Sequence, residues 1–277
     1  MLINSKDLLL YARDQAFAVP ATNFIDLDSA RTFVQVAEEL NLPLILAFAQ
    51  SHRHLISLDE AALIGNYLAD QAKTPVVLHL DHGEDFDFIK RAIDLGFKSV
   101  MIDASNQDFQ TNIGLSKQVV DYAHPLGVSV EAELGHVGSN DTNEGAISDS
   151  IYTQAEDVVD FVEATGVDSL AISIGTAHGF YKGKPHINFD SLDRIRLATE
   201  IPLVLHGGSS TGDDNLNRCA TQGIAKINIF SDFLKGAIDH IQQTESNDYL
   251  TIKAAANQGM RETLTHYYHV FETKEFR

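Results

Sequence analysis

The sequence predicts a (β/α)₈ barrel, and three observations support this fold class. The chain has 277 residues, close to the roughly 250 residues of a typical barrel. Eight short aliphatic segments alternate with longer segments of helical periodicity. Apolar residues, 44% of the chain, are spread evenly without a linker-like block. We therefore expect a single barrel domain over residues 1–277, with a helical segment from about residue 240; a doubly wound open sheet is the alternative.

The eight predicted strands are rich in β-branched and aliphatic residues. In chain order they are FAVPATNF from Phe17, LPLILAFA from Leu42, PVVLHLDH from Pro75, SVMIDAS from Ser99, VSVEAELG from Val128, SLAISIGTAHG from Ser169, PLVLHGGSS from Pro202 and AKINIF from Ala225. The segments between them have apolar residues at i, i+3 and i+4, acidic residues near their starts and Gly near several ends, which predicts helices. Examples are DLDSARTFVQVAEEL from Asp26, DFDFIKRAIDLG from Asp85, QTNIGLSKQVVDYAHPLG from Gln110 and QAEDVVDFVEATG from Gln154.

The composition argues against several functional classes. A formal net charge of −19 is unfavourable for binding nucleic acid, because phosphate backbones attract clustered Lys and Arg. No apolar run reaches the roughly 20 residues of a membrane span, and the N-terminal MLINSKDLLLYARDQ has charges inside any signal core. The lone cysteine, Cys219, agrees with a reducing compartment. We expect a soluble cytoplasmic protein.

Three histidines indicate a metal site. Barrel active sites lie at the carboxyl ends of the strands, and His82, His178 and His206 follow the third, sixth and seventh predicted strands at corresponding depths. Three imidazoles with one open position are typical of catalytic zinc. Each histidine alone could be a hydrogen-bonded loop residue, but the shared placement of the three favours zinc. His79, inside the third strand, is expected to be a packed residue or one that supports a ligand.

Carboxylates accompany these histidines at the same end of the predicted barrel. Asp81 directly precedes His82 and suits proton transfer, or equally a carboxylate that orients an imidazole. Asp103 and Glu133 are candidates for an alternate metal ligand or for such a support. Burying these groups without partners costs about 2–7 kcal/mol each, so we expect a metal or substrate to satisfy them.

Two loops suggest a phosphate site. The loops GGSSTGDDN and NIFSD follow the last two strands, where barrels often bind phosphate. They could also be two ordinary tight turns. The basic residues Lys182 and Lys184, after the sixth strand, are a local source of positive charge or solvated surface lysines. The candidate phosphate-binding residues in the two loops are Gly207, Gly208, Ser209, Asn228 and Ser231.

Taken in order, these motifs resemble the class II, zinc-dependent ketose-bisphosphate aldolases, the fructose-bisphosphate and tagatose-bisphosphate aldolases. The resemblance runs to about residue 240 through FAVPATNF, HLDHG, SVMIDAS, VSVEAELG, IGTAHGFYKG, PLVLHGGS and KINIFSD. It implies a (β/α)₈ barrel that reversibly cleaves a ketose 1,6-bisphosphate to dihydroxyacetone phosphate and an aldehyde such as glyceraldehyde 3-phosphate. It implies zinc on His82, His178 and His206, proton transfer by Asp81, and assembly as a homodimer or homotetramer. It also implies a monovalent cation (Na⁺ or K⁺) and binding of the dihydroxyacetone phosphate moiety by Gly179, Gly207, Ser209, Asn228 and Ser231. Asn23, Lys182 and Gly208 are further candidates for substrate binding by their position at the strand ends.

The sequence departs from the family pattern in places that affect substrate choice. After the fifth strand it reads VGSNDTNEG, which leaves Asp141 or Glu144 as the candidate acid of that loop. The C-terminal part lacks the usual Asp-Pro-Arg type of segment and offers Arg261 for a distal phosphate. The loop AQSHRHL after the second strand contains Arg53, either a ligand for a terminal anion or a solvated residue.

Other functions remain open on the sequence alone. The chain could cleave a ketose 1-phosphate or another modified phosphorylated ketose, or be a catalytically silent sugar-phosphate-binding protein. A Schiff-base aldolase needs a lysine inside the barrel, for which Lys226 on the eighth strand is the candidate. A metal-dependent hydrolase would use zinc to activate water instead of a ketone.

Overall fold

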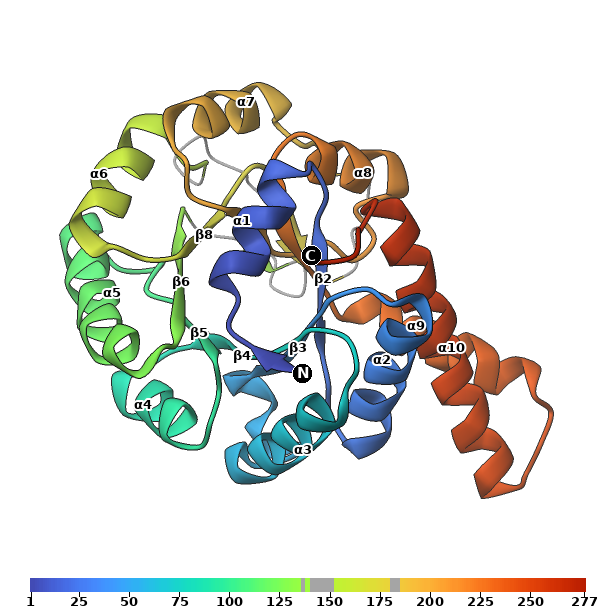
Figure 1. The fold of residues 1–277 in the computed structure, drawn as a ribbon. Coiled ribbons are helices and arrows are strands. Elements are labelled where there is room, and N and C mark those ends of the chain that lie inside the picture. The colour runs from blue at the N-terminus through green and yellow to red at the C-terminus, as the bar shows by residue number, and fades with distance from the viewer. Residues whose placement is uncertain (136–137, 140–151, 180–184) are drawn as a thin grey trace.

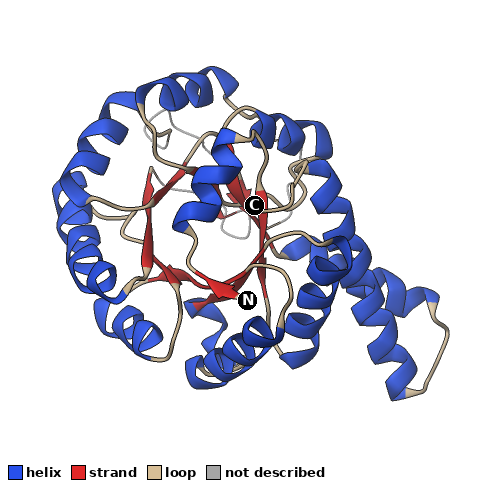
Figure 2. Cartoon of the chain, viewed as in Figure 1, coloured by secondary structure: helices blue, strands red, loops and turns tan. Residues whose placement is uncertain are grey.

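The core of the protein is a closed ring of eight parallel strands, seen end-on in Figures 1 and 2. The structure, a computed structural model, describes residues 1–135, 138–139, 152–179 and 185–277. Pairing of β4 with β5 closes the ring, which confirms the predicted (β/α)₈ barrel. The ring strands are β2 (Val19–Asn23), β3 (Leu44–Ala49), β4 (Val76–Gly83), β5 (Ser99–Ile102), β6 (Ser129–Leu134), β8 (Ser169–Ile172), β10 (Leu203–Leu205) and β11 (Ile224–Ile229).

Helices surround the ring because each buries one apolar face against it. Several begin at residues that cap the free N–H groups of the first turn: Asp26 accepts from the N–H of Ser29, and Ser57 from that of Glu60, each in a capping box. The outer elements are α2 (Leu27–Leu40), η1 (Gln50–His54), α3 (Leu58–Gln71), α4 (Phe86–Asp94), α5 (Phe109–Ala123), η2 (His124–Leu126), α6 (Ala155–Thr165), α7 (Phe189–Ala198) and α8 (Asp213–Thr221).

The amino-terminal end of the barrel is closed by the start of the chain. Strand β1 (Leu2–Ile3) pairs with β4, and helix α1 (Lys6–Asp14) lies across the opening in Figure 1. Leu8 and Leu9 of α1 belong to a buried cluster with Phe17, Val19 and Val77 at this end. The opposite end, where the strands finish, is therefore the one available for a site.

Two helices at the C-terminus pack tightly on each other. Helix α9 (Ser231–Gln243) contacts α10 (Tyr249–Val270) at Gly236 and Gly259. A Cβ atom added to Gly259 would lie only 2.0 Å from the carbonyl oxygen of Gly236. Only glycines allow such close approach of the two backbones. The connected ends of the pair project from the barrel in Figure 1. Across all described residues, no helix is both long and apolar enough to cross a membrane.

The sixth predicted strand is shorter than the sequence suggested. A continuous strand was expected from Ser169 to Gly179, and this extent is wrong: β8 ends at Ile172. Gly175, with φ of 114°, turns the chain, and a Cβ there would lie 2.2 Å from the carbonyl oxygen of His186. After this turn β9 (Ala177–His178) pairs with β7 (Gly138–Ser139) in a separate two-stranded sheet.

Candidate active site

Asp81 and His82 face the barrel mouth together because the backbone of β4 is irregular. In a regular strand, neighbouring side chains point to opposite faces. His82 has a left-handed backbone with φ of 46°, and the register of β4 with β5 shifts between Leu80 and Gly83. A non-glycine residue held in this conformation costs about 1–3 kcal/mol and is typical of functional sites.

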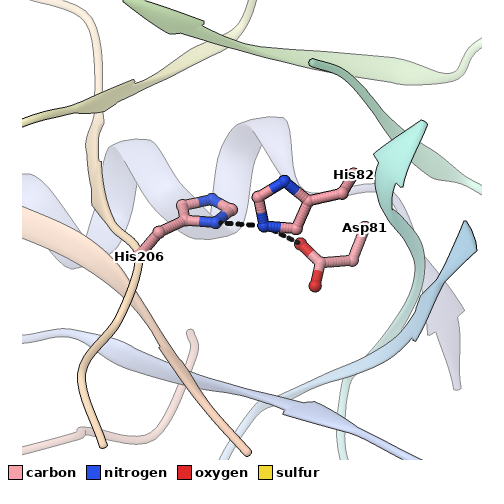
Figure 3. A group of neighbouring side chains, drawn as sticks. All are labelled: Asp81, His82 and His206. Carbon is pink, nitrogen blue, oxygen red and sulfur yellow. Dashed lines mark hydrogen bonds and ion pairs between the residues drawn. The ribbon is translucent and has the colours of Figure 1, made fainter. Parts of the chain in front are cut away.

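His82 and His206 converge on one point from two sides of the barrel (Figure 3). His82 Nε2 lies 2.9 Å from His206 Nδ1. The outer nitrogens are each held by a carboxylate, His82 Nδ1 at 2.9 Å from Asp103 Oδ2 and His206 Nε2 at 2.9 Å from Glu131 Oε1. A carboxylate on the outer nitrogen is the usual support of a metal-binding histidine, because it fixes the tautomer and the ring orientation.

Two groups of side chains here could hold a metal ion. Asp81, His82 and His206 offer ligand atoms that all lie within 4.8 Å of one another, and so do His82, Asp103 and Glu133. Imidazole and carboxylate donors suit zinc. The donor chemistry therefore fits the metal expected from the sequence, with His82 common to both groups.

The third predicted metal ligand, His178, has a described backbone but a side chain outside the described residues. Its strand β9 lies beside the loop that carries His206, since a Cβ on Gly207 would come within 2.5 Å of the carbonyl oxygen of Ala177. Gly207, with φ of 67°, allows this close approach. The neighbouring backbones support a place for His178 near the other two histidines, and its role as a ligand stays a prediction.

The carboxylate of Asp81 is buried and held from both sides. Its Oδ2 accepts a hydrogen bond from Asn23 Nδ2 at 2.8 Å and its Oδ1 one from Asn228 Nδ2 at 2.9 Å. Burial acts to raise the pKa of Asp81, but the positive charge at His82, followed by the interaction with the His206 imidazole, outweighs it and lowers this pKa. Asp81 is therefore an ionised, oriented base at neutral pH.

The two histidines differ in charge. Burial acts to lower the pKa of His82, but Asp81 and the hydrogen bond to Asp103 raise it to about 10. For His206, burial and then the charge on His82 lower the pKa. Without a metal, His82 carries the proton and donates it towards His206, so the acidic surroundings favour a positive charge where a metal cation would sit.

The expected phosphate loops lie next to this cluster. Ser209 is buried, and its Oγ accepts from the backbone N–H of Phe230 at 3.1 Å and of Asp232 at 3.4 Å. A hydroxyl that accepts in this way can also donate its hydrogen. Gly208 donates its N–H to the carbonyl oxygen of Asn228 at 3.1 Å. Ser231 is the first residue of α9, where helix N–H groups favour anions. Gly179 directly follows β9 with φ of 86°.

Four other predicted residues lie outside the described residues. Asp141, Glu144, Lys182 and Lys184 fall in the ranges that the structure does not describe. Arg53 is an exposed residue of η1.

Lys226 and His52 both lie in or beside the site, which their strand and loop motifs alone do not predict. Lys226, the Schiff-base candidate, is buried in the barrel with Nζ 2.7 Å from Glu131 Oε2, so its amine is ion-paired. His52, in the loop AQSHRHL, lies against Phe230 with ring centroids 4.5 Å apart and the ring planes tilted by 39°, and its buried Nδ1 has no hydrogen-bond partner among the described residues. Burial lowers the pKa of His52, and Asp81 acts to raise it. Its position just after β3, at the same barrel end, was the available signal.

Comparisons with known proteins agree with this geometry. Residues 3–275 match the family model described as fructose-bisphosphate aldolase class-II, so the likeness continues well past residue 240. YdjI of Escherichia coli (strain K12) is 36% identical over 251 residues, covering 91% of this chain and 90% of YdjI. The D-tagatose-1,6-bisphosphate aldolase subunit GatY of Klebsiella oxytoca is 36% identical over 277 residues, covering 97% of each chain.

Solved structures give the same result. The crystal structure of the YdjI aldolase from Escherichia coli K12 matches with a TM-score of 0.90 and 32% identity, covering 99% of this chain and 98% of that one. Fructose-bisphosphate aldolase from Campylobacter jejuni shares the fold, with a TM-score of 0.84 at 22% identity. That match covers all of this chain and 97% of the other. This chain therefore belongs to the class II fructose-bisphosphate aldolase family and is an aldolase, a carbon–carbon lyase.

Proposed function

We propose that this protein catalyses the zinc-dependent, reversible aldol cleavage of a ketose 1,6-bisphosphate of the fructose or tagatose type. The products are dihydroxyacetone phosphate and an aldehyde such as glyceraldehyde 3-phosphate. The observation that carries the proposal is the buried carboxylate of Asp81, held by two amides, beside two converging imidazoles at the barrel mouth. Aldol cleavage needs a base for a hydroxyl proton and a cation for the charge left on carbon. The similarity to GatY supports a bisphosphate substrate.

The metal would be held by His82 through Nε2 and by His206 through Nδ1, with His178 as the third ligand. Asp103 and Glu133 would serve as supports or, with His82, as an alternate ligand set. When bound there, zinc would supply Lewis-acid chemistry, polarising the C2 carbonyl of the substrate and stabilising the negative charge that cleavage leaves behind.

Asp81 would remove the proton of the C4 hydroxyl during cleavage and return it during condensation. Asn23 and Asn228 orient its two oxygens, so that the base is placed before the substrate arrives. Asn228 Oδ1 is buried without a hydrogen-bond partner in the described part of the chain. An orphaned acceptor costs free energy, and a substrate hydroxyl would satisfy it. Asp141 stays the candidate for a second acid.

The C1 phosphate would bind to the loops after β9, β10 and β11. The hydroxyl of Ser209 and the start of α9 at Ser231 supply donors, and Lys182 is the proposed positive charge. Gly179, Gly207 and Gly208 would let the backbone approach the phosphate oxygens.

A ketose 1-phosphate is the second candidate substrate, because the described structure offers little for a distal phosphate. Arg261 is paired with Glu39 on α2. Arg53 is exposed at the site end of β3, and we propose it as the residue on which a preference for bisphosphates depends.

We extend the proposal to the protein as a whole. The chain would act as one domain over residues 1–277, in a cytoplasmic homodimer or homotetramer, with a monovalent cation near the phosphate. A net charge of −19 supports the expectation that its partners include neither nucleic acid nor membranes.

A coupled assay for dihydroxyacetone phosphate tests the proposed reaction. The purified protein is stripped with a chelator, checked by elemental analysis, and assayed before and after addition of zinc with fructose 1,6-bisphosphate, tagatose 1,6-bisphosphate and the matching 1-phosphates. We expect cleavage only after zinc is added. Wild-type rates from verified metal-free protein would overturn the proposal, and hydrolysis of simple esters without cleavage of any ketose phosphate would favour a hydrolase.

A further inference from the structure

A buried ion pair lies directly beneath the two histidines. Glu131 on β6 and Lys226 on β11 are each only 1% exposed. Lys226 Nζ donates to both carboxylate oxygens of Glu131, at 2.9 Å from Oε1 and 2.7 Å from Oε2. The pair spans the interior of the barrel, because β10 and β8 separate these two strands in the sheet.

The same carboxylate holds His206. Glu131 Oε1 lies 2.9 Å from His206 Nε2, and because a carboxylate paired with a lysine can only accept, the proton of this imidazole belongs on Nε2. The lone pair of Nδ1 then points at the place where His82 Nε2 also points. With Lys226 on both of its oxygens, Glu131 has no freedom to rotate away from the imidazole.

Lys226 is itself fixed from below. Its Nζ lies 3.2 Å from Nε2 of His79, whose Nδ1 is 2.8 Å from the hydroxyl of Ser99. The Ser99 hydroxyl contacts that of Ser5 at 3.0 Å, next to the start of α1. A continuous hydrogen-bonded column therefore runs from the closed end of the barrel to His206.

Stability alone does not account for this column. Apolar residues of similar size in place of a buried ion pair are often neutral or stabilising. Removing one partner of such a pair, by contrast, leaves a buried charge. The pair is therefore best explained by what it holds.

We propose that Lys226 and Glu131 are positioning residues for the metal, with Lys226 fixing Glu131 and Glu131 presenting Nδ1 of His206 to the ion. The inference rests on the proposed role of His206 as a metal ligand. It gives Lys226 a function in this aldolase without a covalent step. Loss of a carboxylate that supports a metal-binding histidine typically costs 10–100-fold in metal affinity.

The test measures zinc affinity by competition with a chromophoric chelator, together with the histidine tautomers by ¹⁵N NMR of the metal-free protein. We expect Glu131→Gln and Lys226→Met to weaken zinc binding about 10–100-fold. We also expect the His206 signal, assigned with His206→Ala, to change from a single Nε2–H tautomer to a mixture. Ser99→Ala is the matched control, because it cuts the same buried column below Lys226 and leaves the ion pair intact. It should lower the unfolding temperature without changing zinc affinity.

A double variant keeps the test valid if Lys226→Met does not fold. Lys226→Met alone leaves a buried carboxylate unpaired, whereas Lys226→Met/Glu131→Gln removes both charges and keeps an oxygen near His206. If the double variant or Glu131→Gln binds zinc within about threefold of wild type and keeps the Nε2–H tautomer, the positioning role is wrong. If His206→Ala itself binds zinc like wild type, the proposed metal site fails instead, so the two failures are distinguishable.

Discussion

Replacing Asp81 by Asn separates the two roles of this carboxylate most cleanly. The amide keeps the shape and one acceptor but removes the charge and the proton-accepting oxygen. Asn23 and Asn228 each donate to one carboxylate oxygen, so one of them must then face an amide N–H₂ or turn its own amide around. The loss of one charge-assisted hydrogen bond costs about 1.5–3 kcal/mol of stability, which corresponds to about 3–5 °C in unfolding temperature for a chain of this size.

The expected effect on turnover is much larger. Loss of a general base lowers kcat by about 10²–10⁴, or about 3–5 kcal/mol of activation free energy. The assay follows dihydroxyacetone phosphate release at saturating zinc, with zinc content and substrate affinity measured on the same sample. Asn23→Ala is the control, since it keeps the carboxylate and removes one orienting bond, and it should reduce kcat less.

Two results would refute this assignment of Asp81. If Asp81→Asn keeps kcat within about threefold of wild type, the carboxylate does not transfer the proton. If the variant loses zinc and regains full turnover in excess metal, Asp81 acts through the metal site instead, in the role of a supporting carboxylate that the sequence left open.

Three further predictions follow from the site and the barrel interior. His206→Ala should lose zinc and cleavage together, and full zinc content after dialysis would contradict its role as ligand. Arg53→Ala should lower kcat/KM for the bisphosphates about 10-fold, or about 1.4 kcal/mol, and leave the 1-phosphates unchanged; an equal effect on both, or none, would remove Arg53 from the site. Burial, then the charge of Lys226, lowers the pKa of His79 from 6.5 to about 3. Below about pH 6.5, His79 therefore binds a proton in the unfolded chain but not in the folded chain. The free energy of unfolding falls by about 1.4 kcal/mol per pH unit as the pH drops towards 3. His79→Gln should remove this share of the slope in urea unfolding between pH 4.5 and 6, and an identical slope would show that His79 does not titrate as expected.

The strand ends were predictable from the sequence because a parallel barrel collects the carboxyl ends of all its strands at one face. That rule was enough to bring Asp81, His82 and His206 together, as the structure confirms. Asn228 and Asn23 also follow from it, but their hydrogen bonds to Asp81 do not, since the direction of a side chain depends on the register of neighbouring strands.

The barrel interior was harder to predict for a physical reason. Glu131 and Lys226 are 95 residues apart and meet only because the sheet closes. A lone lysine in a strand motif suggested a nucleophile, and its partner could not be identified without the closed ring. The break between β8 and β9 was missed because Gly175 lies in a run that otherwise reads as apolar strand. Its left-handed backbone is a consequence of the packing against His186.

The left-handed backbone of His82 limits which substitutions there can be interpreted. The contacts of the imidazole with Asp103 and His206 offset the cost of this conformation. Alanine would remove those contacts, and the strand would then relax towards an extended form that rotates Asp81 as well. Alanine at position 82 would therefore disturb both the imidazole and the neighbouring carboxylate. Alanine at position 206 would remove the imidazole alone, because the backbone of His206 has no positive φ to relax. Asparagine, which tolerates the left-handed region, is the better replacement for His82, because the base next to it stays in place.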